Sequence, residues 1–84
     1  MGYEVVNLSS STCVNVMLDE SSMVIVFTIV DDTNQEVKYA CTCENFAQAR
    51  GIDHSKLSVS DWKNFCASMK GKKVNFILKD NSDE

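Results

Sequence analysis

The sequence predicts a small α+β domain, in which a curved antiparallel sheet carries two helices in the order β-β-β-α-α-β. Apolar and polar side chains alternate in successive segments before residue 42, helical spacing follows, and alternation returns after residue 72. Runs of strands followed by helices are typical of this class. A chain of 84 residues is long enough for only one core, and three Gly and no Pro are too few for a disordered chain. We therefore expect one compact domain over residues 1–84 with a flexible acidic tail at 80–84.

Three antiparallel strands are expected in the first half of the chain. Residues 13–18 and 36–41 alternate with the period of a half-buried strand, whereas residues 23–30 are apolar on both faces and predict a central strand. Turn-forming residues separate the three segments at 19–22 and 31–35. The short apolar segment at residues 3–6 leaves open an additional N-terminal strand.

A short first helix is predicted where the period changes. Cys43, Phe46 and Ala47 fall at positions i, i+3 and i+4, Thr42 is suited to cap the N-terminus, and Gly51 is suited to end the helix. The helix has about two turns, so its stability depends on packing against the sheet.

The start of the second helix has the clearest local signal. Ser58 and Asp61 have the spacing of a capping box, while Leu57 and Trp62 occupy the two positions of a hydrophobic staple. Gly71 ends the helix. We expect the strand at residues 73–79 to turn three side chains inward, namely Val74, Phe76 and Leu78.

The central strand leaves a row of valines on the face opposite the helices. Alternation places Val24, Val26 and Val30 on that face, with Met17 and Ile77 at matching positions on neighbouring strands and Lys38 and Lys73 at the rim. Exposed apolar rows of this kind are normally covered. Three arrangements would cover the valine row. The sheet could close into a partial barrel resembling an OB-fold, the N-terminal segment could fold across it, or a second molecule could dock on it.

The charge is distributed unevenly along the chain. The net charge is −4, and residues 1–49 hold seven acids against one base. Four acids sit in the two predicted turns: Asp19, Glu20, Asp31 and Asp32. An acidic half of this kind is suited to a basic surface on a partner protein, including one that normally receives nucleic acid.

The second half supports a different candidate, a single-stranded nucleic-acid-binding accessory protein. Between residues 56 and 79 six lysines face one acid, and aromatic residues lie among them. The lysines proposed for this role are Lys63, Lys70, Lys72 and Lys73. Charge with interleaved aromatic residues is typical of surfaces that bind single strands. Trp62 and Phe76 fall on predicted core faces, however, and the chain as a whole is acidic, so this function is the alternative.

Metal and catalytic motifs are weak. Cys41 and Cys43 are separated by one residue rather than by the two of a zinc knuckle, so we expect reduced, buried thiols and no metal or cofactor. Cys43, at a helix start, has the one position that favours a lowered pKa. The consecutive residues 53–55, Asp-His-Ser, do not form a catalytic triad, because triads assemble from distant segments.

These observations favour a non-enzymatic protein-binding or inhibitory domain that acts through its surface. The predicted contact residues are the three valines of the central strand and the four acids of the turns. The partner is a protein, and a homodimer stays open. Small acidic inhibitors encoded by viruses and mobile elements are comparable in size and charge. The chain has no apolar segment long enough to span a bilayer and no secretory signal pattern, so we expect a cytoplasmic protein that does not bind membranes.

Overall fold

The computed structural model describes residues 2–81. In chain order the elements are β1 (Tyr3–Asp19), β2 (Val24–Val30), β3 (Glu36–Thr42), α1 (Cys43–Ala49), the 3-10 turn η1 (His54–Lys56), α2 (Val59–Met69) and β4 (Lys72–Asp80). Within the described residues the four strands form one antiparallel sheet in the order β3-β2-β1-β4. The predicted α+β class and element order are confirmed.

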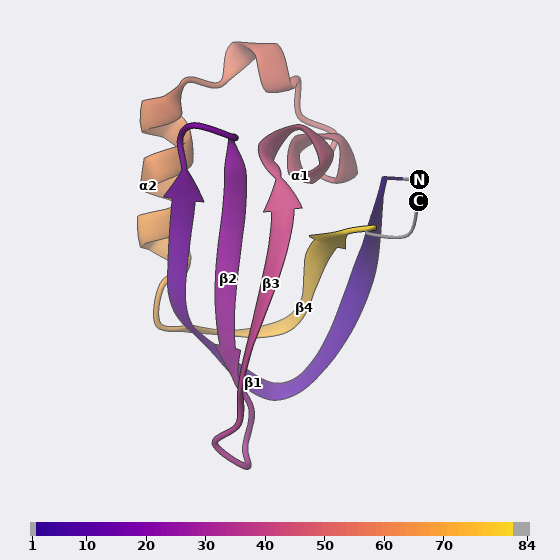
Figure 1. The fold of residues 1–84 in the computed structure, drawn as a ribbon, viewed down its shortest axis with the longest axis vertical. Helices are drawn as coiled ribbons and strands as arrows, with labels where there is room; N and C mark the ends of the chain where they lie inside the picture. The colour runs from indigo at the N-terminus through magenta and orange to yellow at the C-terminus, as the bar shows by residue number, and fades with distance from the viewer. Residues whose placement is uncertain (1, 82–84) are drawn as a thin grey trace.

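β1 is one long strand that serves two neighbours. Its second half pairs with β2, and its first half pairs with β4 as far as Tyr3 opposite Asp80. The sequence predicted two separate segments here, because the polar residues between them show no alternation. Ser10 has a φ of 54°, and the β1–β4 register shifts between Asn7 and Ser11. This irregularity lets the strand bend, as Figure 1 shows at the bottom of the view.

A cluster of hydrogen bonds closes the sheet into a half-barrel. The carboxylate of Asp80, at the end of β4, accepts hydrogen bonds from the Thr42 backbone N–H at 3.1 Å and from Asn45 Nδ2 at 3.0 Å. Asn45 Nδ2 also donates to the Gly2 carbonyl at 3.1 Å. Asp80 was assigned to the flexible tail, so that boundary is wrong at this residue. The next tail residue, Asn81, donates its backbone N–H to the Gly2 carbonyl at 3.0 Å, and residues 82–84 lie outside the described residues.

Both helices begin and end as the sequence predicted. The Thr42 side chain caps α1 by accepting from the Asn45 N–H. Ser58 and Asp61 form a full capping box at the start of α2. Gly51 and Gly71 follow the helices with φ of 72° and 84°, conformations that favour glycine.

The core lies between the helices and the inner face of the sheet. Phe27 of β2 stacks on Phe46 of α1 with ring centroids 6.1 Å apart, and Trp62 of α2 meets Phe46 edge to face at 6.2 Å. The buried apolar residues are Cys13, Val16, Ile25, Phe27, Ile29, Cys41, Cys43, Phe46, Ala47, Trp62, Cys66, Ile77 and Leu78. The helices therefore cover one face of the sheet. None of the described helices is long and apolar enough to cross a membrane.

Candidate functional sites

The outer face of the sheet brings the three predicted valines together. In the strand register Val26 lies between Met17 of β1 and Ala40 of β3. Met17 is 60% exposed, Ala40 is exposed, and Val24, Val26 and Val30 are half-buried. We call Met17, Val24, Val26, Val30 and Ala40 the outer strip. None of the five belongs to the hydrophobic core cluster or to the side chains packed against it, whereas the helices contribute their buried residues to that core.

One predicted member of this face is wrong. Ile77 pairs with Val6, is 3% exposed and belongs to the core. The prediction rested on alternation alone, whereas β4 pairs with the part of β1 that lies beyond the register shift between Asn7 and Ser11. Lys73, by contrast, does lie at the edge of the outer strip, since Thr12 pairs with both Val30 and Lys73.

The acidic residues lie at both ends of β2. Asp19 stands opposite Val24 at one end, with Glu20 next to it, and Asp31 and Asp32 follow Val30 at the other end. A strand of this length spans about 20 Å. Two of these carboxylates also organise turns, and their hydrogen bonds with the turn residues hold the pKa of Asp19 and of Asp31 below the usual value. Both carboxylates are therefore charged at neutral pH.

Of the four lysines of the alternative site, one is ion-paired and the other three are exposed and close together in the sequence. Lys63 pairs with Glu20 at 2.7 Å, and Lys70 caps the C-terminus of α2, close in sequence to Lys72 and Lys73 at the start of β4. Trp62 is 3% exposed and so offers no ring to a base. Phe76, which we expected inside, is 56% exposed and so is open to solvent.

All four cysteines are free, buried thiols, as expected. Burial is the main cause that raises the pKa of every one of them, to about 12 for Cys41 and to about 11 for Cys43. The position of Cys43 at a helix start does not lower its pKa, because desolvation of the thiolate by burial is the dominant effect. Within residues 2–81 no group of three or more His, Cys, Asp or Glu side chains is placed to hold a metal ion.

The Asp-His-Ser sequence forms a local turn. Asp53 caps η1, its carboxylate accepting from the Ser55 hydroxyl at 2.8 Å and from the Ser55 N–H at 3.1 Å. The His54 ring is half-buried and lies 6.3 Å from Trp62. His54 contacts a core ring, while Asp53 and Ser55 bond to each other, so their arrangement supports a structural role.

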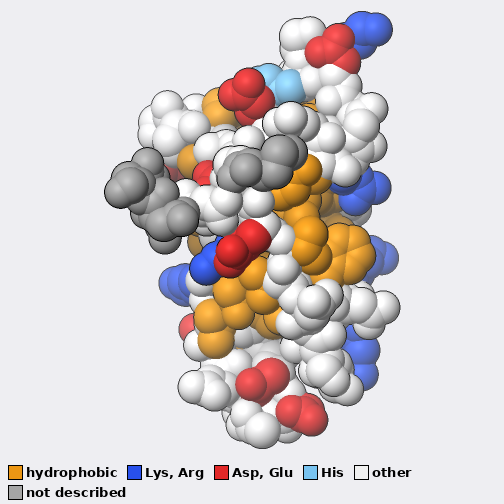
Figure 2. All heavy atoms as spheres, turned by 90° about the vertical axis from the view of Figure 1, so that its right-hand side faces the viewer, with side chains coloured by type: hydrophobic (Ala, Val, Ile, Leu, Met, Phe, Trp, Pro, Cys, Tyr) orange, Lys and Arg blue, Asp and Glu red, His pale blue; other side chains and the backbone are white. Residues whose placement is uncertain are grey.

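A pocket that the sequence analysis did not predict opens between β1, β4 and the two helices. Its volume is about 630 Å³. The lining residues are Tyr3, Val5, Phe27, Phe46, Ala49, Arg50, Met69, Val74, Asn75, Phe76, Ile77 and Leu78. Phe76 and Val5 are 56% and 54% exposed, although Leu78, the strand partner of Val5, is buried. Apolar side chains gather on this side of the molecule in Figure 2.

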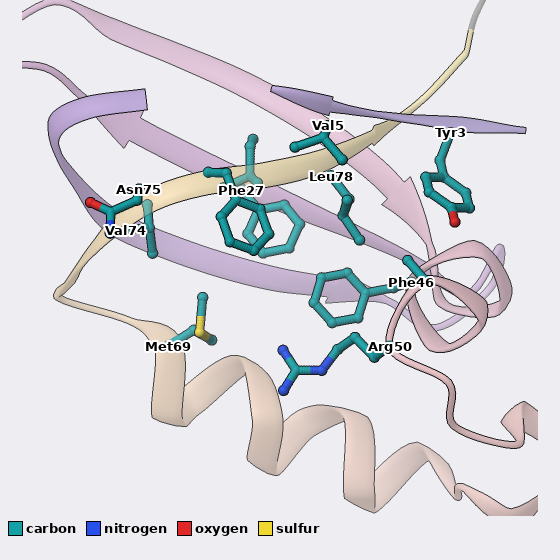
Figure 3. Close-up of a pocket in the computed structure, with 12 residues that line it drawn as sticks. Tyr3, Val5, Phe27, Phe46, Arg50, Met69, Val74, Asn75 and Leu78 are labelled. Carbon is teal, nitrogen blue, oxygen red and sulfur yellow. The ribbon is translucent and has the colours of Figure 1, made fainter. Parts of the chain in front are cut away.

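The pocket exists because the helices do not reach the far end of the half-barrel. Five consecutive residues of β4, 74–78, line the pocket, so the predicted alternation of Val74, Phe76 and Leu78 does not hold here: Leu78 is buried, Val74 is half-buried and Phe76 is exposed. In Figure 3, Leu78 and Phe27 lie on the strand side, Met69 projects from α2, and the Arg50 side chain extends between α2 and Phe46. The signal that could have revealed the pocket was the length of α1, which at seven residues is too short to cover four strands.

Comparison with models of known protein families, with curated proteins and with solved structures finds no match to this chain.

Proposed function

We propose that this chain is a non-enzymatic protein-binding domain that docks a partner through the outer strip. The observation that carries the proposal is the row of Met17, Val26 and Ala40, whose partly or fully exposed apolar side chains adjoin one another across three strands. Covering exposed apolar surface is favourable by roughly 25 cal/mol per Å². A regular sheet face also presents these side chains rigidly, so little ordering opposes binding.

The charges around the outer strip define the chemistry of the partner. Asp19 is registered beside Val24, Glu36 beside Val30, and the exposed Asp32 lies in the following turn. Lys38 and Lys73 interrupt this border, and these three acids outnumber the two lysines. The complementary partner is a protein with an apolar surface bordered by Lys or Arg. Where that surface is also a nucleic-acid site, docking would inhibit it by competition.

A site-specific photo-crosslinking experiment tests the proposal. A benzoylphenylalanine placed at Met17 is expected to crosslink a cellular protein at an apolar segment flanked by basic residues. The matched control places the same group at Ser60, an exposed residue of α2 outside the outer strip. Crosslinking from position 17 should be lost in Val26→Glu, because this change puts a charge in the apolar row. It should fall several-fold in the Asp19→Asn, Glu36→Gln double variant, because this variant removes two border charges.

The outcomes separate the alternatives. Equal crosslinking from positions 17 and 60, or crosslinking unaffected by Val26→Glu in a folded protein, would refute the outer strip as the docking surface. A crosslink to a second copy of the chain would show that the outer strip forms a homodimer interface instead of binding another protein. The nucleic-acid function would instead be supported if labelled single strands bind the protein, if this binding falls steeply as salt rises, and if it is lost in the Lys70→Glu, Lys72→Glu, Lys73→Glu triple variant.

A further inference from the structure

The pocket between the half-barrel and the helices has the size and chemistry of a small-molecule site. Its volume of about 630 Å³ lies within the range of roughly 300 to 1,000 Å³ that is usual for such sites. Phe27, Phe46 and Leu78 are buried and form an apolar floor, while Phe76 and Val5 leave more than half of their surface in water. A ligand with an apolar body would cover both exposed side chains.

One cation sets the polarity of the pocket. Arg50, the one arginine of the sequence, lines it, with its guanidinium carbon 5.7 Å from the centroid of the Phe46 ring. Within residues 2–81, the ion pairs are Lys63 with Glu20 and Lys79 with Glu4, so no described carboxylate neutralises Arg50. Stacking on an aromatic ring orients a guanidinium without removing its charge or its donors.

One carboxylate that shares a hollow with Arg50 has another role. Asp61 lines a smaller adjoining hollow of about 170 Å³ together with Arg50, Phe46 and Trp62. Its carboxylate accepts hydrogen bonds from the Ser58 N–H at 2.9 Å and from the Ser58 hydroxyl at 3.1 Å, which complete the capping box of α2. Asp61 therefore stabilises a helix start, and Arg50 keeps its donors for a ligand.

We propose that this pocket binds a small amphipathic monocarboxylate, with the apolar body against Phe76, Val5 and Leu78 and the carboxylate on Arg50. A guanidinium matches a carboxylate with two parallel N–H···O bonds, and such charge-assisted pairs are stronger than neutral hydrogen bonds. The apolar floor supplies the remaining contacts, and the half-barrel walls exclude water from them. The site is separate from the outer strip, so either proposal stands if the other fails.

A head-group series at constant chain length tests the assignment. Titration calorimetry with decanoate, below the concentration at which it forms micelles, is compared with decanol and with decyltrimethylammonium. Decanoate is expected to bind at least tenfold more tightly than decanol, and the cation most weakly. Amide chemical shifts on decanoate binding should change at Val5, Phe76 and Arg50, and not at Val26 on the outer face.

Matched variants divide the binding between the charge and the apolar surface. Arg50→Gln should remove the preference for decanoate over decanol, whereas Lys56→Gln, an exposed lysine outside the pocket lining, should leave it unchanged. Phe76→Ser should weaken decanoate and decanol alike by several-fold, and because Phe76 is exposed this variant should fold. The proposal would be overturned if all three compounds bind the folded wild type equally or if none of them binds. It would also be overturned if the amide chemical shifts change elsewhere than in the pocket.

Discussion

Removing the carboxylate of Asp80 should loosen the closure of the half-barrel. The carboxylate accepts hydrogen bonds from the Thr42 N–H, which both oxygens share, and from Asn45 Nδ2. A hydrogen bond to a charged group contributes about 1.5 to 3 kcal/mol when it is buried. Asp80 is half-buried, so water partly replaces the lost partner, and we expect the lower end for each bond. Asp80→Ala should therefore lower the free energy of unfolding by about 2 to 3 kcal/mol.

Two further variants identify the cause. Asp80→Asn keeps one acceptor oxygen and should lose only about 1 kcal/mol. Lys79→Ala removes a partly exposed ion pair with Glu4, at 3.4 Å, from the neighbouring position and should lose less than about 1 kcal/mol. A domain of 84 residues has a total stability of roughly 4 to 13 kcal/mol, so the effect of Asp80→Ala is readily resolved.

Urea unfolding followed by circular dichroism measures these losses, and amide exchange of Thr42 locates them. If closure depends on Asp80, exchange of the Thr42 N–H should accelerate in Asp80→Ala by more than the change in global stability explains. A loss below about 0.5 kcal/mol with unchanged Thr42 exchange would refute the reasoning, because it would mean that packing of the strands alone holds the two ends of the sheet together.

Three other perturbations have defined outcomes. Trp62→Ala should lower the free energy of unfolding in urea by about 3 to 5 kcal/mol, since Trp62 is 3% exposed and contacts Phe46. Val59→Ala, at a position 38% exposed in the same helix, should lower it by about 1 kcal/mol or less. A similarly small loss for Trp62→Ala would contradict the core position of Trp62. Ser58→Ala should lower stability by about 1 kcal/mol through loss of the capping box, and Ser58→Asn should restore most of it in the same assay. Burial raises the pKa of the Cys41 thiol to about 12, so the neutral thiol stabilises the fold fully below about pH 9, its unfolded value, and this stability is lost as the pH rises toward 12. Urea midpoints measured from pH 7 to 11 should therefore fall only above pH 9. If Cys41→Ala does not reduce that fall, ionisation of Cys41 is not its cause.

Local signals in the sequence predicted the elements because each depends on a few neighbouring residues. The capping box of α2, the glycines that follow both helices and the turn aspartates all have the predicted roles. Alternation also predicted the two apolar faces of β2, which the outer strip and the core now account for. These features depend on spacing within about ten residues.

The bend of β1 could not be predicted in the same way. It depends on Ser10, whose positive φ is uncommon for serine, and on pairing with β4 from the other end of the chain. Beside the bent half of β1 the burial of β4 does not alternate, since the adjacent residues Ile77 and Leu78 are both buried while Phe76 is exposed. The pocket was missed for the same reason, since its walls come from elements far apart in the sequence.

The pairing of Tyr3 with Asp80 also has a kinetic consequence. The Asn81 N–H donates to the Gly2 carbonyl at 3.0 Å, so the start of β1 and the end of β4 lie side by side (Figure 1). The β1–β4 ladder is the least local contact of the fold, and non-local pairing slows folding. A circular permutant that links residues 81 and 2 and opens the exposed turn at residues 32–35 would make this ladder a hairpin. It should refold faster than the natural order, while β2 and β3 become the distant pair that forms last.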